Sequence, residues 1–298
     1  MREWTGFSAR ADGPDDSRTP PDARSGLIDN LYRLGVRSGD ILLVHSSLRR
    51  LGFVVGGAAT VVQALLAAVG PDGTVVVPTF TANNSDPSRW ALTRGQAVPQ
   101  ECWPAIREQL PPFDPTVTPS ERMGAISEMI RTWPGAVRSQ HPQTSFAAVG
   151  ADASALMADH PLDCHLGPAS PLGRLAESGA EVLLLGVSFA VCSGFHLAEY
   201  EVPNPPQRDY ECVISRQGRR TWYRYRDVLL DDRQFAALGT ALENSSTGAL
   251  IRCGPVGDTC AKLVALQKCV EFARAWLSVA AQRPNPPGRC LRGAVGQE

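Results

Sequence analysis

A histidine and a glutamate three positions apart, His196 and Glu199, have the residue types and spacing best suited to acid–base chemistry in this chain. A helical turn over residues 195–200 would place both side chains on one face. A carboxylate beside an imidazole fixes the tautomer of the ring, which makes the histidine a better general base. The alternative is a surface ion pair, because a His-x-x-Glu pair without further context is common on exposed helices.

A second histidine, His45, has a comparable place in the sequence. It follows the apolar run 41–44, and His196 comes after the apolar run 181–187; both runs have the length and branching of buried strands. Ligands of open α/β sheets bind at the carboxyl ends of the strands. If these two strands are neighbours, we expect His45, His196 and Glu199 to meet in one cleft.

The run 41–44 opens a strand–helix–strand unit that ends at Thr81. Apolar residues recur at helical spacing from Val61 to Val69, and a turn at 71–73 leads into a second apolar run, 74–77. Such a unit normally makes two parallel strands joined by a right-handed crossover. The polar residues that follow the two strands would then share one edge of the sheet: they are His45, Ser46, Ser47, Thr79 and Thr81.

The loop that ends at Gly56-Gly57 has features of an anion site. It leads into the N-terminus of the predicted helix, whose unpaired N–H groups attract negative charge, and Arg49 and Arg50 add positive charge nearby. Our hypothesis for this edge of the sheet is a ligand that carries phosphate groups. The loop matches neither the dinucleotide-binding nor the P-loop glycine pattern, so an ordinary strand–helix loop with solvent-facing serines is the alternative.

Composition limits the classes of function. The chain has 298 residues, 43% of them hydrophobic, and a net charge of −1, which indicates a globular protein and argues against general binding to nucleic acid or membrane surfaces. No apolar run reaches the roughly 20 residues that span a bilayer, and the N-terminal segment lacks the apolar core of a signal peptide. We therefore expect a cytoplasmic protein. Its eight cysteines include no C-x-x-C pair, which favours reduced thiols.

The remaining sequence indicates one domain with polar ends. We predict flexible tails at residues 1–22 and 284–298 and a single domain over 23–283. The proline-rich segment 83–119 is typical of a long loop, which inside a domain usually has a function. Other expected elements are a helix at 124–132, a strand at 145–150, a β-hairpin formed by 212–215 and 221–225, and a long amphipathic helix over 258–281.

Two hydrolase chemistries compete with the His–Glu interpretation. A zinc site would use His160, Asp163, Cys164 and His165, but this short segment needs ligand partners that the sequence does not plainly offer. Serine hydrolase chemistry is disfavoured because residues 186–190 break the G-x-S-x-G pattern at its last position.

Ten short motifs follow one another in the order found in one enzyme family. They are His45-Ser46-Ser47-Leu48, Gly56-Gly57, Pro71-Asp72-Gly73-Thr74, Pro78-Thr79-Phe80-Thr81, Phe113-Asp114-Pro115, Met123-Gly124, Arg138-Ser139 with His141-Pro142, Ser145-Phe146, Ser170-Pro171 and His196-Leu197-Ala198-Glu199. From about residue 25 to about residue 280, the chain resembles the aminoglycoside 3-N-acetyltransferase family. No single motif is as specific as a nucleotide-binding signature; the resemblance depends on their common order.

The resemblance implies a fold, a reaction and a donor. The fold is a mixed α/β sheet flanked by helices with a smaller, partly antiparallel C-terminal portion, distinct from the GNAT acetyltransferases. The reaction transfers the acetyl group of acetyl-CoA to the 3-amino group of the 2-deoxystreptamine ring of aminoglycoside antibiotics, which confers resistance, and it needs no metal. The enzyme would act as a monomer or homodimer. Two alternatives are an acetyltransferase of this fold for a different amine, such as a biosynthetic intermediate, and a non-catalytic module that binds CoA or sequesters the antibiotic.

The resemblance also implies roles for individual residues of this sequence. The resemblance implies that His196 is the general base and that Glu199 orients it or contacts substrate, with His45 as a further catalytic residue. It implies a cofactor wall that comprises Ser46, Ser47, Leu48, Arg49, Thr79, Thr118 and Met123. Residues 188–194 depart from the more polar loop of the relatives, which leaves the substrate contacts there open.

The implied reaction makes two demands on the side chains. An aminoglycoside amine is mostly protonated near neutral pH, so a base must take its proton while N–H or hydroxyl groups stabilise the tetrahedral oxyanion. We expect direct attack of the amine on acetyl-CoA in a ternary complex. A polycationic substrate also needs carboxylates, and the candidates beside loops expected near the site are Asp86, Glu101, Asp163, Glu199, Asp209 and Asp231.

Overall fold

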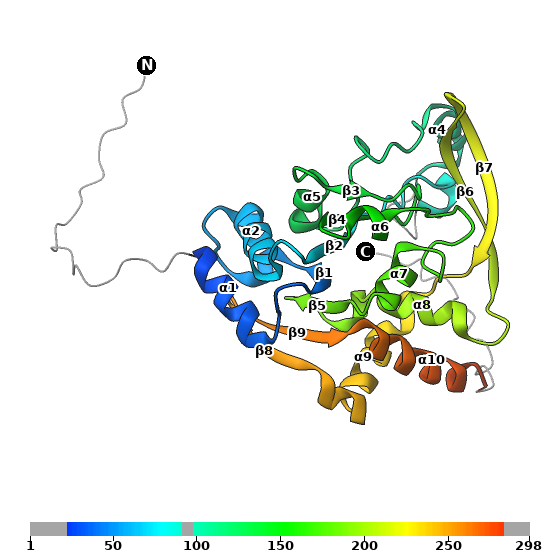
Figure 1. Ribbon diagram of the computed structural model, residues 1–298. Helices are drawn as coiled ribbons and strands as arrows, with labels where there is room; N and C mark the ends of the chain where they lie inside the picture. The colour runs from blue at the N-terminus through cyan, green and yellow to red at the C-terminus, as the bar shows by residue number, and fades with distance from the viewer. Residues whose placement is uncertain (1–22, 91–97, 283–298) are drawn as a thin grey trace, which may run out of the picture.

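A seven-stranded mixed sheet forms the middle layer of an α/β/α arrangement in the computed structural model, which describes residues 23–90 and 98–282 (Figure 1). Its strand order is β3-β4-β2-β1-β5-β9-β8. The strands are β1 Ile41–Ser46, β2 Thr74–Pro78, β3 Val137–Arg138, β4 Phe146–Gly150, β5 Glu181–Leu185, β8 Arg252–Val256 and β9 Thr259–Ala265. The predicted tails, 1–22 and 284–298, lie outside the described residues.

The three central strands run parallel and bring together the segments that the sequence analysis singled out. Leu43 of β1 is in register with Val76 of β2 on one side and with Val182 of β5 on the other. The strand–helix–strand unit predicted to end at Thr81 is therefore confirmed. Because β1 and β5 are neighbours, the condition for His45 and His196 to share a cleft is met.

Antiparallel strands extend the sheet on both sides. β4 pairs with β2 and carries β3, whereas β9 pairs with β5 and carries β8. A separate hairpin, β6 Gln207–Arg216 and β7 Arg219–Val228, rises along one side of the molecule (Figure 1). This mixed sheet with an additional antiparallel hairpin confirms the predicted fold class.

Side chains alternate along the central strands and build a core on each face of the sheet. Leu42 and Val44 belong to the core on one face and Leu43 to the core on the other, and all three are fully buried. The first face is covered by α1 Ala23–Leu34, α2 Gly57–Val69 and α5 Ala125–Arg131. The second is covered by α6 Ala153–Met157, α7 Pro171–Glu177, α8 Gly194–Glu201, α9 Phe235–Glu243 and α10 Leu266–Gln282.

Two predictions of secondary structure were wrong in detail. Residues 259–265, predicted as the start of helix 258–281, form strand β9 between β5 and β8, and the helix begins at Leu266. Ala261 and Leu263 are buried while Lys262 between them is less so, an alternation that suits a strand once partners are available on both sides. The described part of 83–119, predicted as a loop, contains helix α4, Trp103–Gln109, which has Pro104 in its first turn.

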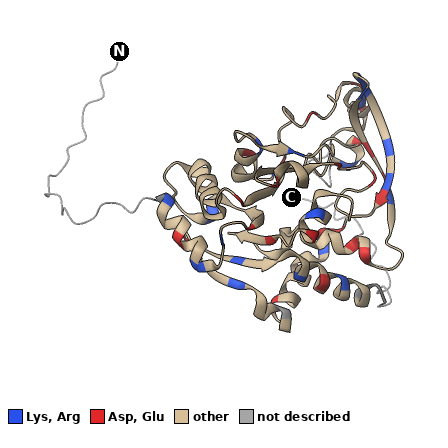
Figure 2. Cartoon of the chain, in the orientation of Figure 1, with Lys and Arg blue, Asp and Glu red and all other residues tan. Residues whose placement is uncertain are grey.

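Charged residues of both signs are spread along the fold (Figure 2). Arginines recur along the hairpin β6–β7, where Arg224 pairs with Asp209 of the facing strand. Within residues 23–90 and 98–282, no helix is long and apolar enough to cross a membrane.

Candidate active site

His196 and Glu199 form a close pair on helix α8. Nδ1 of His196 lies 2.7 Å from Oε2 of Glu199, and the two side chains are only 13% and 10% exposed. The other carboxylate oxygen, Oε1, accepts a 2.9 Å hydrogen bond from the backbone N–H of Asp231. The carboxylate therefore favours the tautomer in which Nδ1–H donates, and Nε2 remains as the proton acceptor. This anchored, largely buried arrangement differs from a mobile surface ion pair.

Packing fixes the helix and the ring of this pair. Helix α8 begins at Gly194, where a Cβ would come within 2.6 Å of Leu266 of α10, so a glycine permits the two helices to approach closely. The ring of Phe235, the first residue of α9, packs on the imidazole of His196 with 4.6 Å between ring centroids. The imidazole is thus held by a hydrogen bond at one nitrogen and by an aromatic face.

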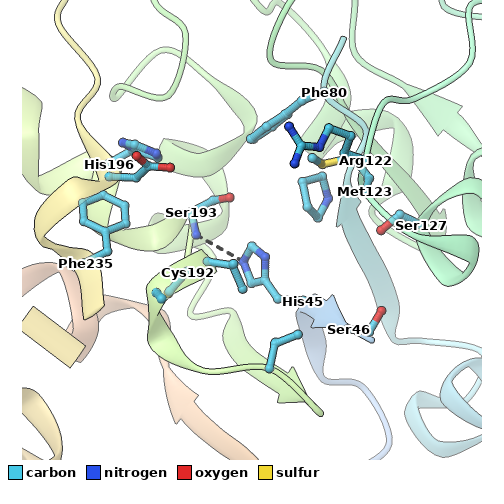
Figure 3. Close-up of a pocket in the computed structure, with 15 residues that line it drawn as sticks. His45, Ser46, Phe80, Arg122, Met123, Ser127, Cys192, Ser193, His196 and Phe235 are labelled. Carbon is cyan, nitrogen blue, oxygen red and sulfur yellow. Dashed lines mark hydrogen bonds between the residues drawn. The ribbon is translucent and has the colours of Figure 1, made fainter. Parts of the chain in front are cut away.

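His45 ends β1 beside the start of α8. Its Nε2 accepts a 3.3 Å hydrogen bond from the backbone N–H of Ser193, so its proton is on Nδ1 (Figure 3). Burial, together with the nearby imidazole of His196, lowers the pKa of His45 to about 4. At neutral pH this ring is uncharged, and it offers a hydrogen-bond donor rather than a positive charge.

Both imidazoles line one cavity of about 350 Å³. In Figure 3, His196 and Phe235 lie on one side of the cavity and Phe80, Arg122 and Met123 on the other, with His45 between them. The complete lining is His45, Ser46, Pro78, Phe80, Arg122, Met123, Ser127, Val187, Ala190, Val191, Cys192, Ser193, His196, Asp232 and Phe235. The expected meeting of the two histidines in a single cleft is therefore observed.

A second cavity, of about 650 Å³, adjoins the first. The two share Ser46, Arg122 and Met123 as lining residues. Five of the residues expected in the cofactor wall line this second cavity: Ser46, Ser47, Leu48, Arg49 and Met123. Its lining also includes Gly57, the first residue of α2, so a helix N-terminus opens onto it.

Two glycines shape the entrance to α2. Gly56 and Gly57 have φ values of 78° and 58°, a region that favours glycine. A Cβ on Gly56 would lie 2.3 Å from Oγ1 of Thr60, the hydroxyl that donates a 2.6 Å hydrogen bond to the carbonyl of Val55. The loop therefore approaches the first turn of α2 more closely than another residue type would permit.

Thr79 and Thr118, also expected in the cofactor wall, line neither of these two cavities. Thr79 is fully buried, and its carbonyl accepts a 2.7 Å hydrogen bond from Nη2 of Arg138. Nη1 of the same guanidinium donates to the carbonyl of Thr118. Burial lowers the pKa of Arg138 to about 10, so it stays charged at neutral pH and links the segments that carry Thr79 and Thr118.

The carboxylates expected to bind substrate are spread over the structure. Asp86 and Asp209 line a separate cavity of about 440 Å³ and are paired with Arg107 and Arg224, each at 2.6 Å. That cavity holds three carboxylates and three guanidinium groups in all, so its charges balance. Glu101 and Asp163 are exposed, and neither lines the cavity with His196. Of the predicted set, Glu199 stands beside the candidate base.

The other three histidines gather in a buried polar cluster beneath the hairpin β6–β7. His165 has ring centroids 4.5 Å from His141 and 4.2 Å from Tyr210. Nε2 of His160 lies 2.8 Å from the carbonyl of His165, and its Nδ1 lies 2.9 Å from Oγ of Ser139. The polar nitrogens of these rings therefore have hydrogen-bond partners within the protein, as buried polar groups usually do.

A single carboxylate, Asp227 of β7, holds this cluster together. It is 4% exposed, and its Oδ2 accepts hydrogen bonds from the N–H of His165 (2.7 Å), from Nδ1–H of His165 (2.7 Å) and from the hydroxyl of Tyr200 (2.6 Å). Burial lowers the pKa of His165, so the contact is a hydrogen bond from a neutral ring to a carboxylate rather than an ion pair. Tyr200 follows Glu199 on α8, so the cluster also ties the hairpin to the helix of the active site.

The described residues offer little support for the zinc alternative. Asp163 is exposed, whereas His160 and His165 are buried with their nitrogens engaged. In residues 23–90 and 98–282, no group of three or more His, Cys, Asp or Glu side chains is arranged to hold a metal ion.

Because four histidines are buried, we expect the free energy of unfolding to decrease in mild acid. Burial lowers the pKa of His45 to about 4 and of His160 to about 3, and it lowers the pKa values of His141 and His165 below their usual 6.5. Between pH 6.5 and 4 the unfolded chain therefore binds more protons than the folded one, and stability falls as the pH falls. Each such histidine contributes up to about 1.4 kcal/mol per pH unit. Urea unfolding at pH 7 and pH 5 should show a drop of at least about 3 kcal/mol; equal stabilities would contradict the buried, neutral state of these rings.

Some residues of the cavity were not identified from the sequence. Ser193 acts through its backbone N–H, which no side-chain pattern reveals. Phe235 and Asp232 come from the segment after the hairpin, far along the chain from His196. The acidic pair Asp231-Asp232, which follows the hairpin in the sequence, was the available signal, and only Asp231 was considered.

Fold and site together define a class of protein. The imidazole of His196, with Nδ1 hydrogen-bonded to a carboxylate, lies near the carboxyl ends of parallel strands, and the adjoining cavity opens onto a helix N-terminus. This arrangement suits removal of a proton from a nucleophile beside a ligand with an anionic portion.

Comparison with known proteins identifies the family. The sequence profile of the aminoglycoside 3-N-acetyltransferases matches residues 43–278, and the chain belongs to this family, whose members are transferases. It is 37% identical to the SPbeta prophage-derived aminoglycoside N(3')-acetyltransferase-like protein YokD of Bacillus subtilis (strain 168), over 88% of this chain and 94% of that one. It is 36% identical to aminoglycoside N(3)-acetyltransferase VII of Streptomyces paromomycinus, over 90% and 96%. The resemblance inferred from the ten motifs is confirmed.

Two solved structures of similar fold contain ligands. AAC-IIIb, solved as a binary complex with CoASH, has a TM-score of 0.76 and 31% identity, over 88% of this chain and 98% of that one. AAC-VIa bound to sisomicin has a TM-score of 0.74 and 31% identity, over 86% and 97%. The predicted non-GNAT acetyltransferase fold is therefore confirmed by both sequence and structure.

Proposed function

We propose that this enzyme transfers the acetyl group of acetyl-CoA to the 3-amino group of the 2-deoxystreptamine ring of aminoglycosides, and that it thereby confers resistance. The observation that carries the proposal is the His196–Glu199 pair, which leaves an imidazole nitrogen free to accept a proton in the wall of a cavity. The neighbours solved with CoASH and with sisomicin support this donor and this class of acceptor. A cytoplasmic setting belongs to the same proposal.

The donor is proposed to occupy the cavity that opens onto α2. Its pyrophosphate would lie near Gly57 and Arg49, where backbone N–H groups and a guanidinium attract negative charge. From there the pantetheine arm would pass the shared residues Ser46 and Met123 and bring the thioester to the cavity of His45 and His196. Ser47 and Leu48 complete this proposed wall, and Arg138 links the segments that carry Thr79 and Thr118.

The reaction is proposed to be a direct transfer in a ternary complex. The nitrogen of the uncharged amine attacks the thioester carbonyl carbon, and one of its protons passes to Nε2 of His196 while Nδ1–H donates to Glu199. His45, neutral at working pH, would donate from Nδ1–H to the oxyanion of the tetrahedral intermediate. The C–S bond then breaks, and the leaving thiolate takes the proton held by His196. Amide and free thiol are the products.

Thiol release from acetyl-CoA tests the proposal. Wild-type enzyme with sisomicin should release CoA thiol at a rate that depends on both substrates, whereas acetyl-CoA alone should be stable. The matched comparison is a panel of simple monoamines at the same concentration. If the enzyme binds acetyl-CoA but releases no thiol with any 2-deoxystreptamine antibiotic, the acceptor is wrong, and an acetyltransferase for a different amine becomes the better account.

A further inference from the structure

One carboxylate in the active-site cavity has no part in the chemistry described above. Asp232 is exposed and lines the cavity together with His196 and Phe235. It is the one Asp or Glu among the described residues that line this cavity. Among residues 23–90 and 98–282, no hydrogen bond or ion pair engages its side chain, so the carboxylate is available to a ligand.

The neighbouring aspartate has a different, structural role. Asp231 caps the short 3-10 helix Asp232–Gln234 by accepting from the N–H of Arg233 at 3.1 Å, and it forms a 2.5 Å ion pair with the same arginine. Its own backbone N–H donates to Glu199. Asp231 thus forms a direct ion pair with Arg233, whereas Asp232 influences that guanidinium only through its nearby charge.

Two contacts fix the position of Asp232 relative to the candidate base. The backbone N–H of Asp231, the residue before it, donates a hydrogen bond to Glu199, which in turn accepts one from His196. Three residues after it, Phe235 packs on the ring of His196. These contacts place the backbone of Asp232 next to His196, so its carboxylate and the proton-accepting nitrogen lie on the same side of the cavity, as a site for a molecule with two binding points requires.

Charge in the surrounding structure favours a cation at this place. Arg122 lies on the wall opposite His196 (Figure 3), so its positive charge disfavours a cation on that wall and leaves the side with Asp232. The separate cavity that holds Asp86 and Asp209 has its carboxylates matched by arginines. A positively charged group that enters the active-site cavity therefore finds its anionic partner at Asp232.

We propose that Asp232 binds a second ammonium group of the acceptor, one that is not acetylated, while another amine of the same molecule is presented to His196. The acceptor class that fits is a polyamine whose amino groups are spread over rigid rings. This inference rests on the proposed function, because it assigns a specificity contact to the same reaction.

The test compares Asp232→Asn with wild type in the thiol-release assay with sisomicin. Loss of a charge-assisted contact at an exposed site should raise KM for sisomicin by roughly three- to tenfold. We expect kcat to stay within about twofold and KM for acetyl-CoA to be unchanged, because the substitution leaves the base and the donor cavity intact. The increase in KM should shrink in about 0.5 M salt, where exposed charges are screened.

Two further variants separate this role from a general effect. Asp29→Asn makes the same change of charge on the exposed face of α1 and should leave both KM values unchanged. Asp232→Glu retains the charge and should recover most of the affinity for sisomicin. The proposal is overturned if Asp232→Asn has the wild-type KM for sisomicin, or if Asp232→Glu is as weak as Asp232→Asn. If wild type does not acetylate sisomicin at all, the proposed function fails first and this inference with it.

Discussion

Replacement of His196 by alanine should lower kcat for acetyl transfer to sisomicin by a factor of about 10² to 10⁴, the usual contribution of a general base. The ring nitrogen that accepts the proton would be lost, whereas the donor cavity lined by Ser46 to Arg49 would be untouched. We therefore expect KM for acetyl-CoA to change little. Steady-state thiol release by the two proteins side by side provides the measurement.

A matched variant distinguishes loss of the base from loss of packing. His196 contacts Phe235, so the alanine variant also leaves space in the cavity. Added imidazole should enter this space and restore part of the activity of His196→Ala without stimulating wild type. Glu199→Gln keeps the shape of the pair and should reduce kcat less than His196→Ala does. An alanine variant that retains more than a tenth of the wild-type kcat would contradict the role of His196.

Replacement of Asp227 by alanine should destabilise the fold by about 3 kcal/mol or more, because several buried donors would lose their acceptor together. These donors are two N–H groups of His165, the hydroxyl of Tyr200 and the N–H of Val228. Hydrogen bonds from His165 and Tyr200 outweigh the effect of burial and lower the pKa of Asp227, so the group lost is a carboxylate. Urea unfolding at pH 7 should show the decrease in the free energy of unfolding.

Tyr200→Phe is the control for this variant. It removes one hydroxyl from the same cluster and leaves the carboxylate in place, so we expect a cost of about 1 kcal/mol. Since Tyr200 adjoins Glu199 on α8, both variants should reduce kcat by loosening the helix that carries His196. Equal stabilities of Asp227→Ala and wild type would show that the cluster does not tie the hairpin to helix α8.

Local sequence patterns were sufficient to predict the strands and the helix at the centre of the fold. The run from Ile41 to Thr81 contains two apolar strands, a helix and the turns between them within one short stretch, so each step has a local signal. Strand β9 had no such signal. Residues 259–265 carry apolar positions compatible with either period, and pairing with β5 and β8, which are distant in the sequence, decides in favour of a strand.

In the candidate site too, some residues could be predicted from local sequence and others depend on tertiary contacts. His196 and Glu199 could be found because their spacing on one helix is itself the geometry of the pair. Carboxylates for the substrate could not be chosen in this way, since whether an aspartate faces a ligand or an arginine depends on tertiary contacts. Asp86 meets Arg107 and Asp209 meets Arg224, whereas Asp232, not selected from the sequence, faces the cavity.

The most direct test of the central claim is to identify the nitrogen that receives the acetyl group. Wild-type enzyme would be incubated with acetyl-CoA and sisomicin, and the purified product examined by NMR. We expect a single monoacetylated product with the acetyl group on the 3-amino nitrogen of the 2-deoxystreptamine ring. A product acetylated at a different nitrogen, or the absence of any acetylated sisomicin while a different amine is consumed, would contradict it.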